Sequence, residues 1–321
     1  MRNTLTRRLG TLEAEALSCA DGLAQSMPFG DGRYTIRVAN DRESREKAYR
    51  LVYRLYLEKE YVRPNASRMW LGAFDALPDT ITLLVEKNVV EGGGWKVEGN
   101  NADNFPQPST LHPQPPTRSA QSAPVGALTV VFDSAAGLPA DELYKAELDA
   151  LRATGRRIAE VVSLGIDADA AGGSEVLVRL FNLIHTASRR VRDATDFVIT
   201  VNPRHVRFYE RMMLFVPMGP ERSYGKVGGA PAVLLRLPLD TPDRVSGRER
   251  QRTLYRQWMN ETEEARAAEV LRRQIRPMSA EEMQHFFGEE SDACAHAAPE
   301  RLASVLQRAA TGEPDAGASL N

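Results

Sequence analysis

Residues 158–166 read IAEVVSLGI and residues 197–201 read FVITV, and a helical pattern fills most of the chain between them. Both short segments are almost continuously apolar, which is typical of strands that are buried on both faces of a sheet. Residues 174–192 place apolar side chains such as Val176 and Leu180 on one side at helical spacing. A strand, a helix and a strand form a βαβ unit, so we expect two parallel strands joined by a right-handed crossover.

The second of these strands is predicted to end abruptly at Asn202-Pro203. An asparagine side chain can cap a helix, and proline suits the first helical position because no N–H is needed there. A helix is therefore predicted over residues 205–212. The sharp turn places Tyr209 in this helix, next to the end of the strand.

The remaining pattern extends the sheet on both sides of this unit. Strands are predicted at residues 34–38, 80–85, 125–132 and 232–237 from runs rich in Val, Leu, Ile and Thr. A helix with one apolar face follows Asp41, and a second is predicted at residues 141–153. The sequence therefore predicts an α/β fold with a central mixed sheet and flanking helices.

Composition divides the chain into regions. Residues 1–32 are a weakly helical leader, and residues 33–240 hold the α/β domain. Within that domain, residues 92–124 are rich in Gly, Pro, Ser, Asn and Gln and are predicted to be a flexible insertion. Residues 241–310 are predicted to form a helical extension, and residues 311–321 a disordered tail.

Charge and cysteine content exclude several classes of protein. The net charge is −2 and the pI is near 6.3, so no general basic excess points to nucleic acid. No apolar run approaches the roughly 18 residues of a membrane span, and no secretory signal is recognisable. Two cysteines, Cys19 and Cys294, do not make a disulfide framework, so a cytoplasmic location is expected. Cys294, His285 and His296 fit no zinc-binding spacing, so no metal is predicted.

Four segments carry a resemblance to known enzymes: AYRLVYRLYLEKEYVRPN (48–65), LPADELYKAELDALRATGRRIAEVVSLGID (138–167), VNPRHVRFYERM (201–212) and ERSYGKVGGAPAVLLRL (221–237). In this order they resemble GNAT-fold acyltransferases. More narrowly, they are similar to the long-chain N-acyl amino acid synthases of the FeeM type, relatives of the acyl-homoserine-lactone synthases. The resemblance implies a GNAT-like fold in which the two parallel strands splay apart and receive the pantetheine arm of a thioester donor.

The resemblance also implies two catalytic residues. Glu160 matches a glutamate that can take a proton from the attacking ammonium group, and Tyr209 matches a tyrosine that can protonate the departing thiolate. Backbone N–H groups at Ser163 and Leu164 can polarise the thioester carbonyl as an oxyanion hole. The alternatives are a surface glutamate paired with a neighbouring arginine, and a half-buried helical tyrosine.

Three positions depart from the family pattern. Ser163 stands where the family commonly has an arginine, which bears on amine recognition. Val52 stands where the lactone synthases keep an arginine, so their S-adenosylmethionine chemistry is not expected. Leu214 replaces a glycine, so the helix is predicted to end without the usual left-handed glycine cap.

The expected donor site lies at the start of the 174–192 helix. Gly172, Gly173 and Ser174 can form a small anion nest for one phosphate, or they are simply a flexible entry to the helix. Asn202 and Arg204 complete the predicted donor site. A single phosphate suits the phosphopantetheine of an acyl carrier protein better than coenzyme A, so acyl carrier protein is the favoured donor.

A basic face is the expected contact for this acidic carrier. Arg189 and Arg190 on one helix and Arg207 on the next are the predicted patch, which would steer an acidic partner. The alternative is an ordinary solvated helix face.

These features together predict an acyltransferase that moves a long acyl group from acyl carrier protein to the amine of an amino acid or similar small amine. No permanently bound cofactor is expected, since the acyl-phosphopantetheine is a co-substrate. The alternatives are a GNAT enzyme that uses acyl-CoA or acetyl-CoA on a small amine or protein, and a GNAT-like binding protein without turnover. Trp70 and Phe74 are candidates for the wall of an acyl tunnel or for ordinary core. The helical extension is a candidate surface for homodimer formation.

Overall fold

The computed structural model describes residues 26–88, 122–169, 174–224, 229–289, 291–294 and 297–311. The predicted leader up to residue 25 and most of the predicted insertion lie outside the described residues, as do the predicted tail from residue 312, Gly172, Gly173 and His296.

Nine strands of the described residues form one mixed sheet in the order β1-β2-β3-β4-β5-β6-β9-β7, and β8 also pairs with β9. The pair β5–β6 is parallel, as the βαβ pattern predicted, and the other pairs are antiparallel. The strands are β1 (Met27–Phe29), β2 (Tyr34–Val38), β3 (Ile81–Asn88), β4 (Ser122–Phe132), β5 (Ile158–Ile166), β6 (Asp196–Val201), β7 (Val216–Pro217), β8 (Arg222–Tyr224) and β9 (Ala230–Pro238).

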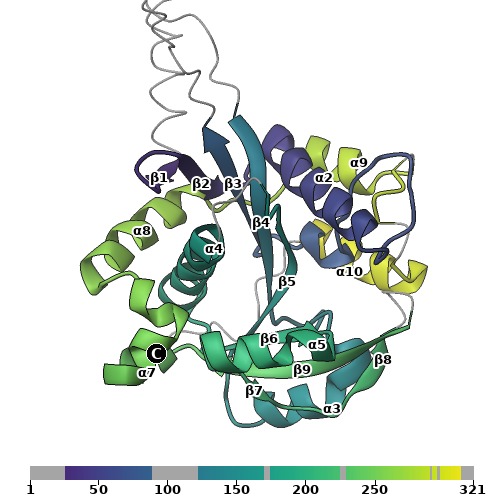
Figure 1. The fold of residues 1–321 in the computed structure, drawn as a ribbon. Coiled ribbons are helices and arrows are strands. Elements are labelled where there is room, and N and C mark those ends of the chain that lie inside the picture. The colour runs from purple at the N-terminus through teal and green to yellow at the C-terminus, as the bar shows by residue number, and fades with distance from the viewer. Residues whose placement is uncertain are drawn as a thin grey trace, which may run out of the picture.

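Helices cover both faces of the sheet (Figure 1). Leu84 of β3 shares a core cluster with α2, whereas its neighbours Leu83 and Val85 share one with α4. The α-helices are α2 (Arg42–Glu58), α3 (Asp141–Arg152), α4 (Ser174–Thr186), α5 (Pro203–Phe208), α6 (Thr241–Arg244), α7 (Gly247–Arg252), α8 (Glu261–Gln274), α9 (Ala280–Phe287) and α10 (Pro299–Thr311). Shorter helical turns are η1 (Ala73–Ala76), η2 (Ala187–Val191), η3 (Tyr209–Met213) and η5 (Leu254–Gln257).

The sheet splits between its two parallel strands. Ile158–Glu160 of β5 pairs with Asp196–Val198 of β6, and beyond this point the two strands have no paired residues. Figure 1 shows β4 and β5 running down the centre of the view, while β6 and β9 run across its lower half. The predicted splay of the two strands is therefore present.

Two boundaries differ from the sequence prediction, and the predicted helical extension is divided. Met27–Phe29, in the predicted helical leader, pairs with Tyr34–Ile36 as strand β1. Strand β4 begins at Ser122, inside the predicted insertion, because residues 122–124 pair with the end of β3. Within the predicted helical extension, the charged stretch that follows residue 247 forms three separate helical elements, because Thr253 and Trp258 adopt extended backbone.

The chain after residue 240 packs against the sheet and its helices. Ala267 and Leu271 of α8 lie in the same core cluster as Leu180 of α4, and Val305 of α10 lies with Tyr144 of α3. These apolar residues are buried within the chain itself. The division into a domain and an extension, and the dimer through the extension, stay predictions.

Candidate active site

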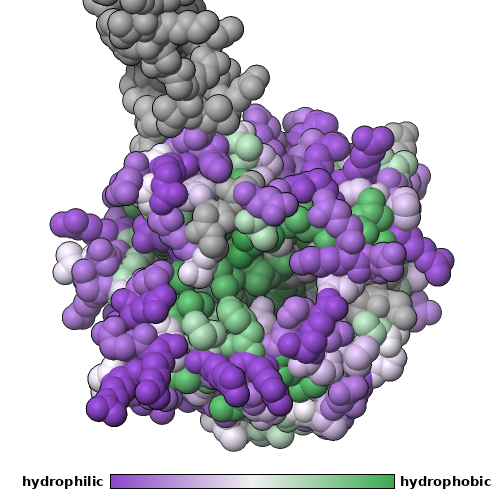
Figure 2. Space-filling view, viewed as in Figure 1, coloured by the Kyte–Doolittle hydropathy of each residue, from purple (hydrophilic) through white to green (hydrophobic). Residues whose placement is uncertain are grey.

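A cavity of about 860 Å³ lies where β5 and β6 separate. Its walls come from both faces of the sheet: Leu177 of α4 and Tyr209 line it, and so do Tyr56 of α2, Pro139 and Arg301 of α10. Figure 2 shows a hollow on this side of the molecule, with hydrophobic residues inside and mostly hydrophilic residues around it. The cavity thus has the size and apolar lining of a small-molecule site.

Glu160 lines this cavity from the last paired position of β5. Its side chain is buried, with 2% of the residue exposed. One carboxylate oxygen, Oε2, accepts a hydrogen bond of 2.7 Å from the backbone N–H of Ala140. This bond fixes the carboxylate at the point where the strands diverge.

The alternative arginine partners of Glu160 are engaged elsewhere. Arg156 binds Asp196, with Nε 2.5 Å from Oδ2, and Asp196 is fully buried. Arg157 donates from Nε to the backbone carbonyl of Asp193. The structure therefore does not support a surface ion pair as the reason for a glutamate in this apolar strand.

A β-bulge lies five to six residues beyond the start of β5. Gly165 pairs with Ala127 and Val162 pairs with Thr129, so Ser163 and Leu164 together oppose one residue of β4. Ser163 adopts a positive φ of 50°, which is uncommon for a residue with a side chain. The bulge takes both residues out of the regular ladder, and both line the cavity. This geometry suits their predicted backbone N–H role.

Tyr209 begins the π-helical turn η3, directly after α5. Its half-buried ring packs edge-on against Phe215, with 5.6 Å between ring centroids. Burial raises the pKa of Tyr209 to about 12, so its phenol keeps its proton at neutral pH. The pKa of Tyr56 is also raised, by burial and by the neighbouring Tyr209, so two protonated phenols lie close together in the cavity.

The cap that ends η3 corrects one sequence prediction. Leu214 adopts the left-handed conformation itself, with φ 61° and ψ 30°, although it is not a glycine. The backbone N–H groups of Leu214 and Phe215 both bond to the carbonyl of Tyr209. Met213 and Phe215, on either side, are each 1% exposed, and their burial holds the turn against its conformational cost.

Of the donor-site residues that the structure describes, Asn202 lines one mouth of the cavity and Arg204 lies beside it on α5, whereas Ser174 does not line the cavity. The side chain of Asn202 caps α5 by accepting from the N–H of Arg204 at 3.2 Å, as predicted. The guanidinium of Arg204 lies over the ring of Tyr61, 5.6 Å from its centroid. Ser174 is the exposed first residue of α4.

Sequence reasoning missed Lys59, Tyr61 and His205, which line the same mouth. The pKa of His205 is lowered, first by burial and then by the positive charges of Arg204 and Lys59. Within the described ranges, neither Lys59 nor Arg204 forms an ion pair with a carboxylate. Lys59 follows the C-terminus of α2, and only the fold brings it to α5.

The predicted carrier patch is not brought together. Arg189 pairs with Asp243 at 2.6 Å, and Arg190 pairs with Glu264 at 2.7 Å. Both lie about 15 residues after Ser174, which is roughly 20 Å along the helix. Arg207, in contrast, is exposed on α5, the helix that follows β6. It therefore lies at the end of the βαβ unit that is far from Arg189 and Arg190.

Three polar residues that the sequence did not indicate as site residues also line the cavity. Glu142 of α3, Tyr224 of β8 and Arg301 of α10 face the cavity near Glu160. The pKa of Tyr224 is raised by burial, then by the negative charges of Glu160 and Glu142, while Arg301 acts in the opposite direction. Tyr224 and Glu142 fall in segments that carry the resemblance, but Arg301 does not.

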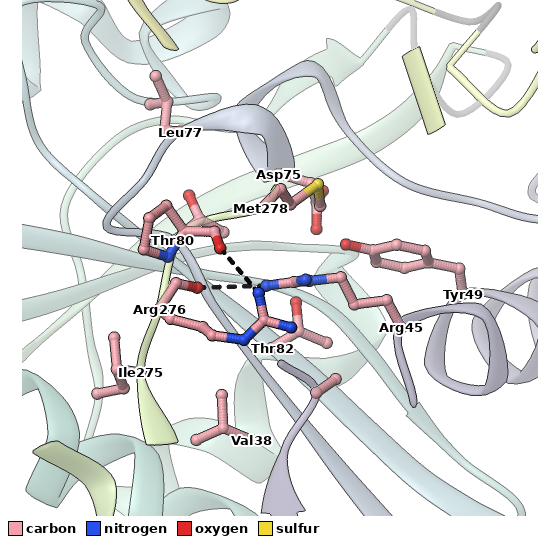
Figure 3. A pocket seen from close by; sticks show the side chains of 12 residues that line it. Val38, Arg45, Tyr49, Asp75, Leu77, Thr80, Thr82, Ile275, Arg276 and Met278 are labelled. Carbon is pink, nitrogen blue, oxygen red and sulfur yellow. Dashed lines mark hydrogen bonds between the residues drawn. The ribbon is translucent and has the colours of Figure 1, made fainter. Parts of the chain in front are cut away.

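A second, much smaller cavity of about 10 Å³ adjoins the first at Asp75, which lines both. That volume holds about one water molecule. The hydroxyl of Tyr49 points toward the Asp75 carboxylate, and Arg45 and Arg276 lie beside them (Figure 3). Burial raises the pKa of Asp75 to about 6.

A mixed sheet that splits between two parallel strands around a bulge and a cavity is the architecture of the GNAT-like acyltransferases, the class predicted from the sequence. Residues 118–238 match the family described as N-acyl amino acid synthase FeeM. The matched segment covers less than half of the chain, but it includes β4, β5, β6 and α5, which form the split. The predicted resemblance is thus confirmed for this segment, which is similar to a family of N-acyl amino acid synthases.

Several solved structures have a similar fold. FeeM, an N-acyl amino acid synthase from uncultured soil microbes, is 22% identical over 71% of this chain and 97% of its own, with a TM-score of 0.48. The AHL synthase LasI is 16% identical over 64% of this chain and 90% of its own, with a TM-score of 0.42. A mutant of the spermidine N-acetyltransferase SpeG from Vibrio cholerae is 12% identical over 65% and 95%, with a TM-score of 0.37. No curated protein matches the chain.

Proposed function

We propose that this protein transfers a long-chain acyl group from the phosphopantetheine thioester of an acyl carrier protein to the amine of an amino acid. The observation that carries the proposal is the buried carboxylate of Glu160, which faces the cavity at the split of the sheet. This split lies in the segment that matches the N-acyl amino acid synthases. A carboxylate in this place can prepare an ammonium group for attack on a thioester in the cleft.

The reaction needs two protons to leave the nitrogen. Glu160 takes the first from the ammonium group, and the neutral amine then attacks the thioester carbon. Backbone N–H groups of Ser163 and Leu164 stabilise the negative carbonyl oxygen. The C–N bond forms, the C–S bond breaks, and the second proton passes from the nitrogen to the departing sulfur, directly or through solvent. The products are an amide and a thiol, with one net proton released.

Tyr209 acts on the leaving sulfur as a hydrogen-bond donor. A free thiol has a pKa of about 8.5, whereas the pKa of Tyr209 is raised to about 12. Full proton transfer from this phenol to a thiolate is therefore uphill. A hydrogen bond from the phenol still stabilises the thiolate as it forms, and this is the role that we assign to Tyr209.

The mouth and walls of the cavity fit the proposed donor. Lys59 and Arg204 supply positive charge at the mouth, where one phosphate can bind. Thr200 lines the cleft, and its buried Oγ1 has no hydrogen-bond partner among the described residues, so it is available to an amide of the pantetheine arm. The apolar side chains that fit an acyl chain are those of Tyr56, Trp70, Phe74, Leu164, Ile166 and Phe208.

A donor comparison tests the proposal. The full chain would be given long-chain acyl carrier protein, the matching long-chain acyl-CoA or acetyl-CoA, each with pooled amino acids, and the amides would be measured by mass spectrometry. We expect amide from the carrier donor at a kcat/KM well above that with either CoA donor. If only the CoA donors give product, acyl carrier protein is not the donor. If no donor gives product, the proposed acyl transfer is wrong.

A further inference from the structure

The chain after residue 240 contributes a charged residue to the candidate active site. Ala297, Ala298 and Arg301 line the large cavity, and Arg301 is the cation among them. These residues lie outside the segment that matches the synthase family, which ends at residue 238. The wall near Glu160 is therefore partly built by this later part of the chain.

Two contacts hold the guanidinium of Arg301 in place. Its Nη2 donates to the backbone carbonyl of Leu138 at 3.0 Å. Its central carbon lies 5.0 Å from the centroid of the Phe74 ring. Both contacts leave charge and further N–H groups available, because a guanidinium has five donors.

The charge of Arg301 has no carboxylate partner within salt-bridge distance among the described residues, although the residue is half-buried. Other arginines among the described residues are paired with carboxylates, as Arg152 is with Asp133 and Asp141. A half-buried guanidinium in a cavity wall is well placed to bind an anionic group of a ligand, because water solvates its charge only partly.

Arg301 and Glu160 are anchored to the same short segment of backbone. Leu138 accepts the hydrogen bond from Arg301, and Ala140, two residues later, donates to Glu160. Because consecutive Cα atoms are about 3.8 Å apart, the two anchoring residues are at most about 7.6 Å apart. Each charged group is hydrogen-bonded to one of these residues, so the cation and the carboxylate lie in the same part of the cavity. One α-amino acid carries an ammonium group for the carboxylate and a carboxylate for the cation.

The charges of the other residues around Glu160 also suit an ammonium group. Glu142 lines the same cavity as Glu160, so a second carboxylate is available to the ammonium group. Tyr224, Glu142, Glu160 and Arg301 all line the cavity. The pKa of Tyr224 is raised by burial and by the charges of both carboxylates and is opposed by Arg301, so these charges lie within electrostatic range of its phenol.

We propose that Arg301 binds the α-carboxylate of the acceptor amino acid while Glu160 receives its ammonium group, so that α10 sets the preference for amino acids over simple amines. This inference rests on the proposed acyl transfer, and it assigns a specificity-determining residue to the chain beyond the synthase-like segment.

The test compares each amino acid with the amine that lacks only its carboxylate, for example phenylalanine with phenethylamine. With a fixed carrier donor, we expect the wild type to prefer the amino acid by about 10- to 100-fold in kcat/KM, the range of a hydrogen bond to a charged group. Arg301→Gln should remove most of this preference by raising KM for the amino acid, with the rate for the amine within about threefold. Arg301→Lys should retain part of it, because the charge remains.

Arg308→Gln on the same helix is the matched control, because Arg308 does not line the cavity, and it should behave as the wild type. Equal loss with amino acid and amine in Arg301→Gln would mean that Arg301 is only a wall residue and would overturn the inference. An undiminished preference in that variant would overturn it too. A wild type that acylates both compounds equally contradicts the inference alone, whereas a wild type without amide product from any donor contradicts the proposed function itself.

Discussion

Glu160 accepts a 2.7 Å hydrogen bond from the backbone N–H of Ala140, at the last residue of β5 that is still paired with β6. The bond crosses from the central strand to the residues that lead into α3. It orients a buried carboxylate at the place where the sheet opens. The side chain of Glu160 is therefore held in a fixed position and still faces the cavity.

Replacing Glu160 by glutamine tests its role as base. The amide oxygen of glutamine can still accept the hydrogen bond from Ala140, but the side chain cannot take a proton from an ammonium group. We expect kcat with the carrier donor to fall by about 10²- to 10⁴-fold, with little change in the melting temperature. Retention of more than a tenth of the activity would show that Glu160 is not the base.

Tyr209→Phe should have a smaller effect, and one that does not depend on pH. The pKa of Tyr209 is raised to about 12, so its phenol is protonated throughout the range from pH 6 to 10. Losing one hydrogen bond to a charged group is expected to reduce kcat by about 10- to 100-fold. The profiles of kcat against pH for wild type and variant should be parallel from pH 6 to 10. If a rising or falling part of the wild-type pH profile is missing in the variant, the phenol of Tyr209 titrates in this range.

Asp75 is expected to make stability depend on pH. Its pKa is raised from 3.8 to about 6 by burial, so the folded protein binds a proton that the unfolded chain has released. The stabilising effect of that proton is fully present below pH 3.8 and is lost as the pH rises through about 6. The total effect is at most about 3 kcal/mol.

Asp75→Asn should remove this dependence, because asparagine can still accept the 2.7 Å hydrogen bond from the N–H of Gly72 without titrating. Urea unfolding of both proteins at several pH values between 4 and 7.5 measures the difference. We expect the variant to gain stability relative to the wild type as the pH rises. A constant difference over this range would show that Asp75 does not titrate there.

The ion pair between Arg45 and Glu282 should stabilise the docking of α9. Both residues are buried, with 5% and 4% exposed, and Glu282 also accepts from Arg276. Removing one member leaves a buried charge without its partner, so Glu282→Gln should lower the free energy of unfolding by about 3 kcal/mol. Glu281→Gln, whose side chain is 85% exposed, is the control and should change it by less than about 0.5 kcal/mol. Equal effects of the two changes would mean that the buried pair contributes little.

Leu214 offers a test of backbone strain. Because its φ is 61°, glycine should fit this position better than a residue with a Cβ atom. The useful comparison is Leu214→Gly with Leu214→Ala, since both lose the same packing. The glycine variant should be more stable by about 1 kcal/mol in urea unfolding. An alanine variant of equal stability would show that the turn relaxes when the side chain is removed.

Local sequence was enough to predict the elements that build the split sheet. The apolar run at residues 158–166 became β5 with the same bounds, and Asn202-Pro203 ended β6 and capped α5 as predicted. These features depend on hydrophobic pattern and on capping chemistry, which act over a few residues. The bulge at Ser163 and the left-handed Leu214 were not predictable, because each is a strained conformation that the surrounding packing imposes.

The sequence by itself indicated six of the strands (β2, β3, β4, β5, β6 and β9), the parallel β5–β6 pair and the two catalytic candidates, because these follow from periodicity and from a recognisable family pattern. Only the tertiary structure brought Lys59 to Arg204 and placed Arg301 in the wall of the cavity near Glu160. Arg301 is 141 residues beyond Glu160 in the chain, and its position depends on how Val305 and its neighbours on α10 pack against α3 and η1. Such long-range packing decides which charges share a cavity, and no local pattern records it.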